Sequence, residues 1–160
     1  MNGERASRSR DSSGAVSWGA RLTAQVPDFG VVALGGAAGS LARYLLTLAI
    51  GSAGEFPLAT FLINILGAFL LGALVEVITR RGGDGGHWRT TRLLFGTGVL
   101  GGFTTYSLLA TDTAELLLAG SVGTAAAYGL GTLLLGGAAS WCGILLGRAL
   151  SGHRVGGGAA

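Results

Sequence analysis

The sequence has little charge, one cysteine and no lysine. Only 12% of its 160 residues are charged, whereas a soluble globular domain carries about 25%. The single cysteine, Cys142, excludes a disulfide framework and a cysteine-rich metal site. Neither histidine, His87 or His153, lies near a pair of carboxylates, and no glycine-rich loop follows a strand-like segment. The sequence therefore predicts no catalytic site and no enzyme.

The residues that are abundant are apolar residues, glycine and arginine. Hydrophobic residues make up 49% of the chain and the mean hydropathy is +0.58, which excludes a disordered protein. The 31 glycines follow no Gly-X-Y period, which excludes collagen. All 11 basic residues are arginines. They lie between long apolar runs rather than on a polar face that could bind nucleic acid. This pattern is typical of a small membrane protein.

Four stretches are long and apolar enough to cross a membrane. A helix needs about 20 mostly apolar residues to span a hydrocarbon core about 30 Å thick. The stretches cover about residues 30–50, 57–78, 93–120 and 123–150. The sequence thus predicts an all-α membrane protein with a four-helix transmembrane domain at residues 30–150. We expect residues 1–29 to form a flexible polar tail, since they lack the apolar core of a signal peptide, and residues 151–160 a C-terminal tail.

The arginines are distributed unequally over the two sides that four spans define. The N-terminal tail, the connection between the second and third spans and the C-terminal tail share one side. Seven arginines lie close to span ends on that side, and three more lie further out: Arg21, Arg80, Arg81, Arg89, Arg92, Arg148 and Arg154, then Arg5, Arg8 and Arg10. The two opposite loops contain none. By the positive-inside rule, this predicts a protein of the cell membrane with both termini in the cytoplasm.

The third span contains an unusual run, GGFTTYS, at residues 101–107. As one straight helix of about 28 residues, the span would measure roughly 42 Å and exceed the thickness of the membrane core. Paired glycines followed by two β-branched threonines favour an unwound break at mid-membrane, because glycine adopts unusual dihedral angles at little steric cost. Carbonyls exposed there would bind a cation, and free N–H groups would face an anion. The alternative is a glycine-rich packing kink.

The first span carries an arginine and a pair of glycines. An arginine within a span costs about 2.5–3.5 kcal/mol on insertion scales. Arg43 therefore either faces water, an anion or a partner, or extends to the membrane interface. Gly35 and Gly39 form a GxxxG pair, which permits close helix contact.

The other spans contain a few polar side chains at helical spacing. One face of the second span carries Thr60, Asn64, Gly67 and Leu71. Asn64 either donates to an anion or joins two helices. In the fourth span, Tyr128 and Thr132 lie on one face and form a second polar track, unless Tyr128 is an interfacial anchor. Asp112 and Glu115, which follow the break, either face an aqueous vestibule or begin the membrane interface.

With these residues in view, the chain resembles the Fluc (CrcB) family of fluoride channels. The resemblance covers nearly all of residues 30–150 and depends on three motifs in order. They are the segment from Gly35 to Tyr44, the segment Asn64–Gly67 and the run GTGVLGGFTTYS at residues 96–107. The third motif is the most specific, because the family shows a glycine pair followed by two threonines, phenylalanine and serine there.

The resemblance implies a dimer of two antiparallel subunits with two fluoride pores and a structural sodium ion at its centre. Main-chain carbonyls of Gly101 and Thr104 would hold the sodium. Fluoride would pass aromatic ring edges and side-chain donors along a pathway of seven positions: Asn64, Thr105, Tyr106, Ser107, Leu109, Tyr128 and Thr132. Arg43 would gather anions at a vestibule, which Asp112 would also line. The expected function is a passive fluoride-selective channel that lowers cytoplasmic fluoride and confers fluoride resistance.

This sequence departs from the family pattern at three positions. The family has two phenylalanines three residues apart in the third span, where this chain has Tyr106 and Leu109. Tyr106 keeps a ring and adds a hydroxyl, whereas Leu109 has no ring. Gly136 lies where the family tends to have serine. A second hypothesis is therefore a partner subunit that conducts poorly or not at all.

The arginine distribution bears on the assembly. A subunit that inserts in both orientations needs nearly balanced loops, and these loops are far from balanced. We therefore expect a subunit of fixed orientation that pairs with an oppositely oriented homologue. The weakest hypothesis is a small proton-coupled exporter, because its early spans would need a carboxylate. The first two spans have Arg43 and Asn64 instead, and Glu76 lies at a span end.

Overall fold

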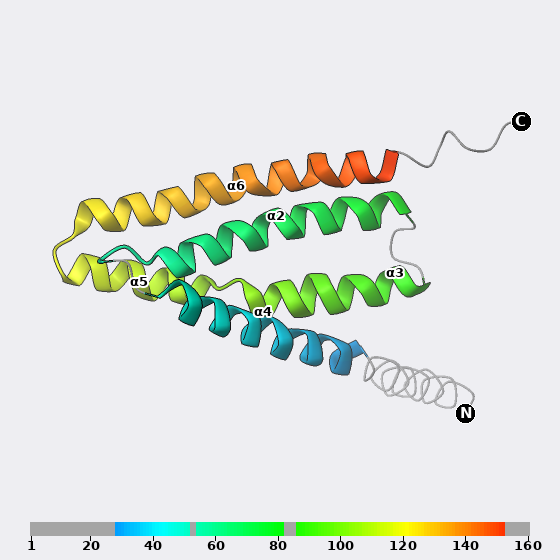
Figure 1. Ribbon diagram of the computed structural model, residues 1–160, viewed down its shortest axis with the longest axis horizontal. Helices are drawn as coiled ribbons and strands as arrows, with labels where there is room; N and C mark the ends of the chain where they lie inside the picture. The colour runs from blue at the N-terminus through cyan, green and yellow to red at the C-terminus, as the bar shows by residue number, and fades with distance from the viewer. Residues whose placement is uncertain (1–27, 52–53, 82–85, 153–160) are drawn as a thin grey trace, which may run out of the picture.

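The protein consists of long helices that run roughly side by side (Figure 1). The computed structural model describes residues 28–51, 54–81 and 86–152. Within these residues, four helical segments are long and apolar enough to cross a membrane: Asp28–Ile50, Leu58–Arg81, Gly86–Leu118 and Val122–Gly152. The second is the single helix α2 and the fourth is the single helix α6. The predicted all-α class and the four spans are confirmed.

The third span is built from four pieces. It begins with α3 (Gly86–Thr91), continues as the π-helical segment η1 (Arg92–Leu100) and the short α4 (Gly101–Phe103), and ends with α5 (Tyr106–Leu118). The span starts several residues before the predicted boundary. The outer helices are also longer than predicted, because the first helix includes Asp28 and Phe29 and α6 includes Ser151 and Gly152.

The remaining residues of the two predicted tails, 1–27 and 153–160, lie outside the described residues. Five of the arginines that predict the orientation lie there too, four in the N-terminal tail and one in the C-terminal tail: Arg5, Arg8, Arg10, Arg21 and Arg154. The described arginines near span ends, namely Arg80, Arg81, Arg89, Arg92 and Arg148, belong to the end where α2 and α6 finish and α3 begins (Figure 1). The segment before α2 and the turn between α5 and α6 lie at the opposite end.

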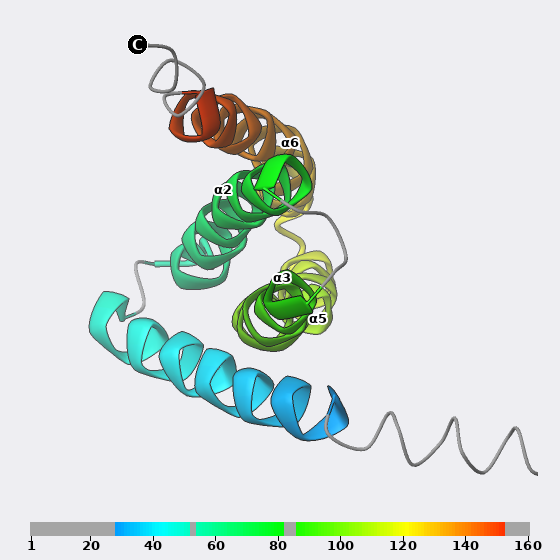
Figure 2. The same ribbon diagram turned by 90° about the vertical axis from the view of Figure 1, so that its right-hand side faces the viewer.

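The first helix and α6 lie on opposite sides of the molecule, with α2 and the third span between them (Figure 2). Glycines bring the first helix into backbone contact with the third span. A Cβ atom on Gly35 or Gly39 would collide with the carbonyl oxygen of Leu94 or Val99, and one on Gly102 would collide with the backbone of the first helix. The predicted GxxxG pair is therefore confirmed as a site of close helix contact.

Glycines and an ion pair also join α2 to α6. The glycines whose Cβ positions are filled by the other helix are Gly72, Gly143 and Gly147. Near the arginine-rich end, Glu76 Oε1 accepts hydrogen bonds from Arg80 Nε at 2.5 Å and from Arg148 Nε at 3.2 Å. The carboxylate thus connects its own helix to α6 where the two helices end.

The third span is interrupted at two threonines. Thr104 has φ −79° and ψ 157°, and Thr105 has φ −150° and ψ 118°, so both residues are extended. The expectation that Gly101 and Gly102 would unwind is wrong, because both lie in α4. The physical reason is packing: Gly102 stays helical and lets the backbone of the first helix approach. The β-branched threonines, which favour extended backbone, take the non-helical angles.

Candidate functional site

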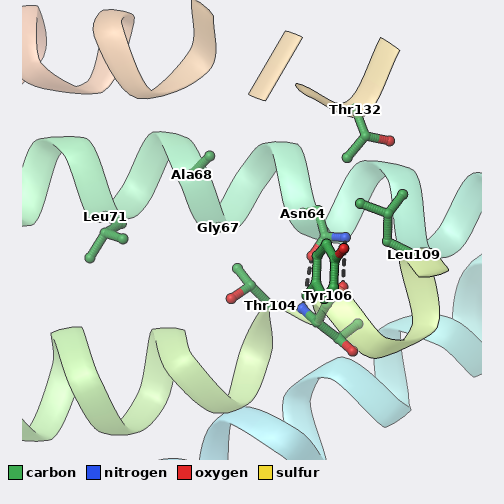
Figure 3. Close-up of a pocket in the computed structure, with 9 residues that line it drawn as sticks. Asn64, Gly67, Ala68, Leu71, Thr104, Tyr106, Leu109 and Thr132 are labelled. Atoms are coloured by element: carbon green, nitrogen blue, oxygen red, sulfur yellow. Dashed lines mark hydrogen bonds between the residues drawn. The ribbon is translucent and has the colours of Figure 1, made fainter. Parts of the chain in front are cut away.

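A cavity of about 300 Å³ lies between α2, α6 and the interruption of the third span (Figure 3). Its lining residues are Asn64, Gly67, Ala68, Leu71, Thr104, Thr105, Tyr106, Leu109 and Thr132. The structure therefore brings together five of the seven positions predicted for an anion pathway. The other two, Ser107 and Tyr128, do not line this cavity. The polar face predicted for the second span contributes three of its four members, and Thr60 is buried elsewhere.

The side-chain amide of Asn64 forms two hydrogen bonds with the backbone of Thr105 (Figure 3). Its Nδ2 donates to Thr105 O at 3.1 Å, and its Oδ1 accepts from Thr105 N at 2.9 Å. Asn64 therefore joins α2 to the third span, as one of the two interpretations of this residue expected. Because an amide nitrogen carries two hydrogens, one N–H remains for the cavity.

The interruption removes the helical donors from two carbonyl groups. In a continuous helix, Thr105 N–H would donate to Gly101 O, and Leu108 N–H would donate to Thr104 O. Instead, Thr105 N–H donates to Asn64, and Leu108 N–H donates to Thr105 Oγ1 at 3.3 Å, which caps α5. The carbonyls of Gly101 and Thr104 are the two expected to hold sodium. Unwound backbone carbonyls suit that ion, so the residues present fit it.

The carbonyl of Gly102, between those two positions, has different partners. Ser40 Oγ donates to Gly102 O at 3.4 Å, and Arg43 Nε donates to it at 3.2 Å. Both side chains come from the first helix. Arg43 is half-buried beside the interruption, a contact that the sequence did not predict. Within the part of the chain that the structure describes, Arg43 donates through Nε alone. Its two terminal nitrogens therefore remain for a ligand.

The hydroxyl groups of the predicted pathway differ in what they can donate. Thr105 Oγ1 and Ser107 Oγ share one hydrogen bond of 3.1 Å, so one of their two hydrogens remains. Thr132 Oγ1 donates to Tyr128 O at 2.6 Å, and Tyr128 Oη donates to Asp112 Oδ2 at 2.9 Å. Each of these last two hydroxyls has a single hydrogen. In this conformation, neither has a hydrogen left for an anion.

Tyr128 lies in an aromatic cluster near the cavity. Its side chain is fully buried, with a relative exposure of 0%. The ring of Phe56 lies edge-on to Phe61 at a centroid distance of 5.3 Å and edge-on to Tyr128 at 5.6 Å, a preferred arrangement of aromatic pairs. Leu109, like the two phenylalanines, packs against the buried cluster of Leu116, Ala125 and Tyr128. The interpretation of Tyr128 as an exposed interfacial anchor is therefore wrong.

A second cavity of about 220 Å³ lies at the end of the molecule where α5 meets α6. Three carboxylates line it, those of Glu55, Asp112 and Glu115. Ser121 Oγ donates to Glu55 Oε2 at 3.1 Å across this cavity. The predicted vestibule residue Asp112 thus lies between the aromatic cluster and this second cavity. Among residues 28–51, 54–81 and 86–152, no group of three His, Cys, Asp or Glu side chains could hold a metal ion.

Comparison with known proteins identifies the family. The family model described as CrcB-like protein, Camphor Resistance (CrcB), matches residues 30–144. The chain belongs to the CrcB-like family. The predicted resemblance is therefore confirmed, and the four apolar helices are those of a multi-pass membrane protein.

Three named relatives are similar to this protein over most of the chain. The fluoride-specific ion channel FluC 2 of Leifsonia xyli subsp. xyli is 47% identical over 124 residues, which cover 78% of this chain and 86% of the relative. A fluoride-specific ion channel FluC of Thermus thermophilus is 46% identical over 124 residues, covering 76% and 96%. The FluC of Phenylobacterium zucineum is 46% identical over 120 residues, covering 74% and 93%.

Two parts of the candidate site were not predicted from the sequence. The reciprocal hydrogen bonds between Asn64 and Thr105 join residues 41 positions apart, so no local pattern could reveal them. Ser40 was not predicted as a site residue, although it lies three positions before Arg43 and therefore on the same helix face. That spacing is the one signal that could have linked it to Arg43.

Proposed function

We propose that this chain is a subunit of a passive, fluoride-selective channel that lowers cytoplasmic fluoride. The observation that carries the proposal is the cavity beside the interruption, where an amide, hydroxyls and an aromatic ring converge. The names of the relatives supply the ion. Efflux of fluoride and chloride from liposomes that contain the purified protein together with an oppositely oriented homologue tests the proposal, because a channel of this kind releases fluoride and retains chloride.

Fluoride would exchange part of its water shell for fixed donors along the pathway. In and beside the cavity, these donors are the second N–H of Asn64, the one hydroxyl hydrogen that the Thr105–Ser107 hydrogen bond leaves over, and the hydroxyl of Tyr106. The edge of the Tyr106 ring adds the positive rim of its quadrupole. Further along α6, Thr132 and Tyr128 would donate to fluoride only after rotation of their hydroxyls.

The positive charge of Arg43 would guide the anion to this pathway. Arg43 lies half-buried at the interruption, and the free N–H groups of its guanidinium would attract fluoride from a vestibule. Asp112 would line the vestibule at the other end, where its carboxylate accepts from Tyr128. The passage needs no covalent step and no ATP.

We further propose a structural sodium ion held by the carbonyls of Gly101 and Thr104. The support for it is that both carbonyls lack their helical donors. Gly101 is also exposed, with nothing within 4 Å of its Cβ position, so its surroundings leave room for an ion and a second subunit. The carbonyls of Gly101 and Thr104 would hold the ion, whose positive charge would lie against their partly negative oxygen atoms beside the extended threonines. Fluoride efflux in sodium-free medium of equal ionic strength tests this: lost efflux supports the site, and unchanged efflux contradicts it.

The assembly that we propose is an antiparallel dimer with an oppositely oriented homologue. The support is twofold. Tyr106 is 81% exposed beside the cavity, so the pathway is open on the side that a second subunit would cover. The five described arginines near span ends lie at one end of the molecule, which favours one orientation with both termini in the cytoplasm.

A second candidate function is that of a partner subunit with a weak pore. The observation that favours it is the position of Leu109, which lines the cavity without an aromatic ring. An aliphatic side chain offers no positive ring edge to an anion. The two candidates differ in the efflux that the chain supports by itself and in its response to a ring at this position.

A further inference from the structure

Side chains from two other helices hold the interruption of the third span. From α2, Asn64 bonds both backbone groups of Thr105. From the first helix, Ser40 and Arg43 donate to the carbonyl of Gly102. The three contacts lie on the two sides of one short extended segment. Backbone groups away from water must find partners, since an unpaired group is strongly unfavourable. These side chains replace bonds that a continuous helix would make within itself.

We propose that Asn64 is a positioning residue, which acts on the ion pathway through the backbone of Thr105 in addition to any contact with the ion. This inference rests on the proposed function only in treating the cavity as an ion pathway. That Asn64 positions Thr105 is argued from the hydrogen bonds alone. Asn64 specifies the extended conformation of Thr105. By taking the Thr105 N–H, it leaves the carbonyl of Gly101 without its helical donor.

The chemistry of the amide explains why this residue suits the task. A primary amide presents one donor and one acceptor in a plane, as a peptide group does. It can therefore pair with the N–H and the C=O of one extended residue, as a neighbouring strand would. A hydroxyl is too short to reach both groups, and a carboxylate has no hydrogen to donate to Thr105 O.

The contact from the first helix makes the interruption stable from its other side. If the helix closed, Tyr106 N–H would donate to Gly102 O. That carbonyl already accepts from Ser40 and Arg43. Loss of Asn64 alone therefore does not return the segment to a helix. It leaves the amide of Thr105 without a partner at the wall of a cavity.

Amide hydrogen exchange of the full-length protein tests the inference. In Asn64→Ala, we expect the amides of residues 104–108 to exchange about tenfold faster than in the wild type, since two hydrogen bonds are lost. The control is Thr132→Val. Thr132 lines the same cavity, but its hydroxyl bonds within α6, so exchange at residues 104–108 should not change.

Asn64→Asp provides a conservative rescue. An ionised carboxylate cannot donate to Thr105 O, so exchange at neutral pH should resemble that of Asn64→Ala. A protonated carboxyl has both an O–H donor and a carbonyl acceptor, so exchange at mildly acidic pH should approach that of the wild type at the same pH. Because this variant is nearly isosteric, it remains informative if Asn64→Ala does not fold.

Three results would overturn the inference. They are unchanged or slower exchange in Asn64→Ala, the same acceleration in Thr132→Val, and no pH-dependent recovery in Asn64→Asp. Fluoride efflux of the wild type is measured separately. If the wild type reconstituted with an oppositely oriented homologue releases no fluoride, the proposed function fails, while the exchange result still decides whether Asn64 holds the interruption.

Discussion

The hydroxyl of Tyr128 donates a hydrogen bond to Asp112 Oδ2 at 2.9 Å, from a side chain that is fully buried. The bond joins α6 to α5 and fixes the part of α5 that follows the interruption. The same tyrosine packs edge-on against Phe56. A polar contact and an aromatic cluster thus meet in one residue beside the proposed pathway.

Tyr128→Phe separates these two contributions. The ring stays, but Asp112 loses its donor while its surroundings remain partly buried. We expect a loss of stability of about 1–2 kcal/mol, measured as a lower melting temperature in detergent. Tyr44→Phe is the matched control, because Tyr44 is 60% exposed and its change should stay within about 0.5 kcal/mol. Equal effects of the two substitutions would show that the buried bond contributes nothing.

Close packing of α2 against α6 predicts a contrast between two glycines of α6. In Gly143→Ala, the new methyl group would collide with the carbonyl of Phe69, and overpacking of this kind costs about 1–3 kcal/mol. Gly137 has nothing within 4 Å of its Cβ position, so Gly137→Ala should be neutral or stabilise the helix by up to about 1 kcal/mol. Thermal unfolding of both variants measures the difference. A Gly143→Ala variant as stable as Gly137→Ala would contradict this packing.

Leu109 determines whether the cavity has a second ring. Leu109→Phe should raise fluoride efflux several-fold if the missing ring limits conduction, because the edge of a ring can face an anion. Leu118→Phe is the control, since Leu118 is 90% exposed and lies away from the cavity. Unchanged efflux in Leu109→Phe would show that the missing ring is not limiting.

A fixed orientation predicts labelling from one side of the membrane. The two test variants are Gly54→Cys and Arg81→Cys in a Cys142→Ser background, because Cys142 is exposed. In intact cells, a membrane-impermeant thiol reagent should label Gly54→Cys and leave Arg81→Cys unmodified. Equal labelling of both variants would mean that the chain inserts in both orientations and would remove the reason to expect a different partner subunit.

The sequence predicts the helices well and the interruption only approximately. The lengths of the apolar stretches predicted most ends of the four spans to within a few residues. This works because each helix must by itself be long enough to cross the membrane core. The position of the interruption depends instead on neighbouring helices. Gly102 stays helical where the first helix packs on it, and the backbone of the extended Thr105 is paired with Asn64 of α2.

The candidate site shows the same division between local and distant information. Polar residue types within apolar runs were enough to select Asn64 and Thr132, and the resemblance to the family added Thr105; all three line one cavity. What each side chain contacts was not predictable, because it depends on the relative rotation of the helices. Arg43 illustrates this point, since its partner is a carbonyl 59 positions away.

The measurement that tests the central claim most directly compares fluoride and chloride efflux from liposomes. The liposomes contain this chain alone or together with an oppositely oriented homologue. We expect rapid fluoride release with chloride retained when both subunits are present, and little release from this chain alone. No fluoride-selective release in either preparation would contradict the account of the chain as a subunit of a fluoride channel.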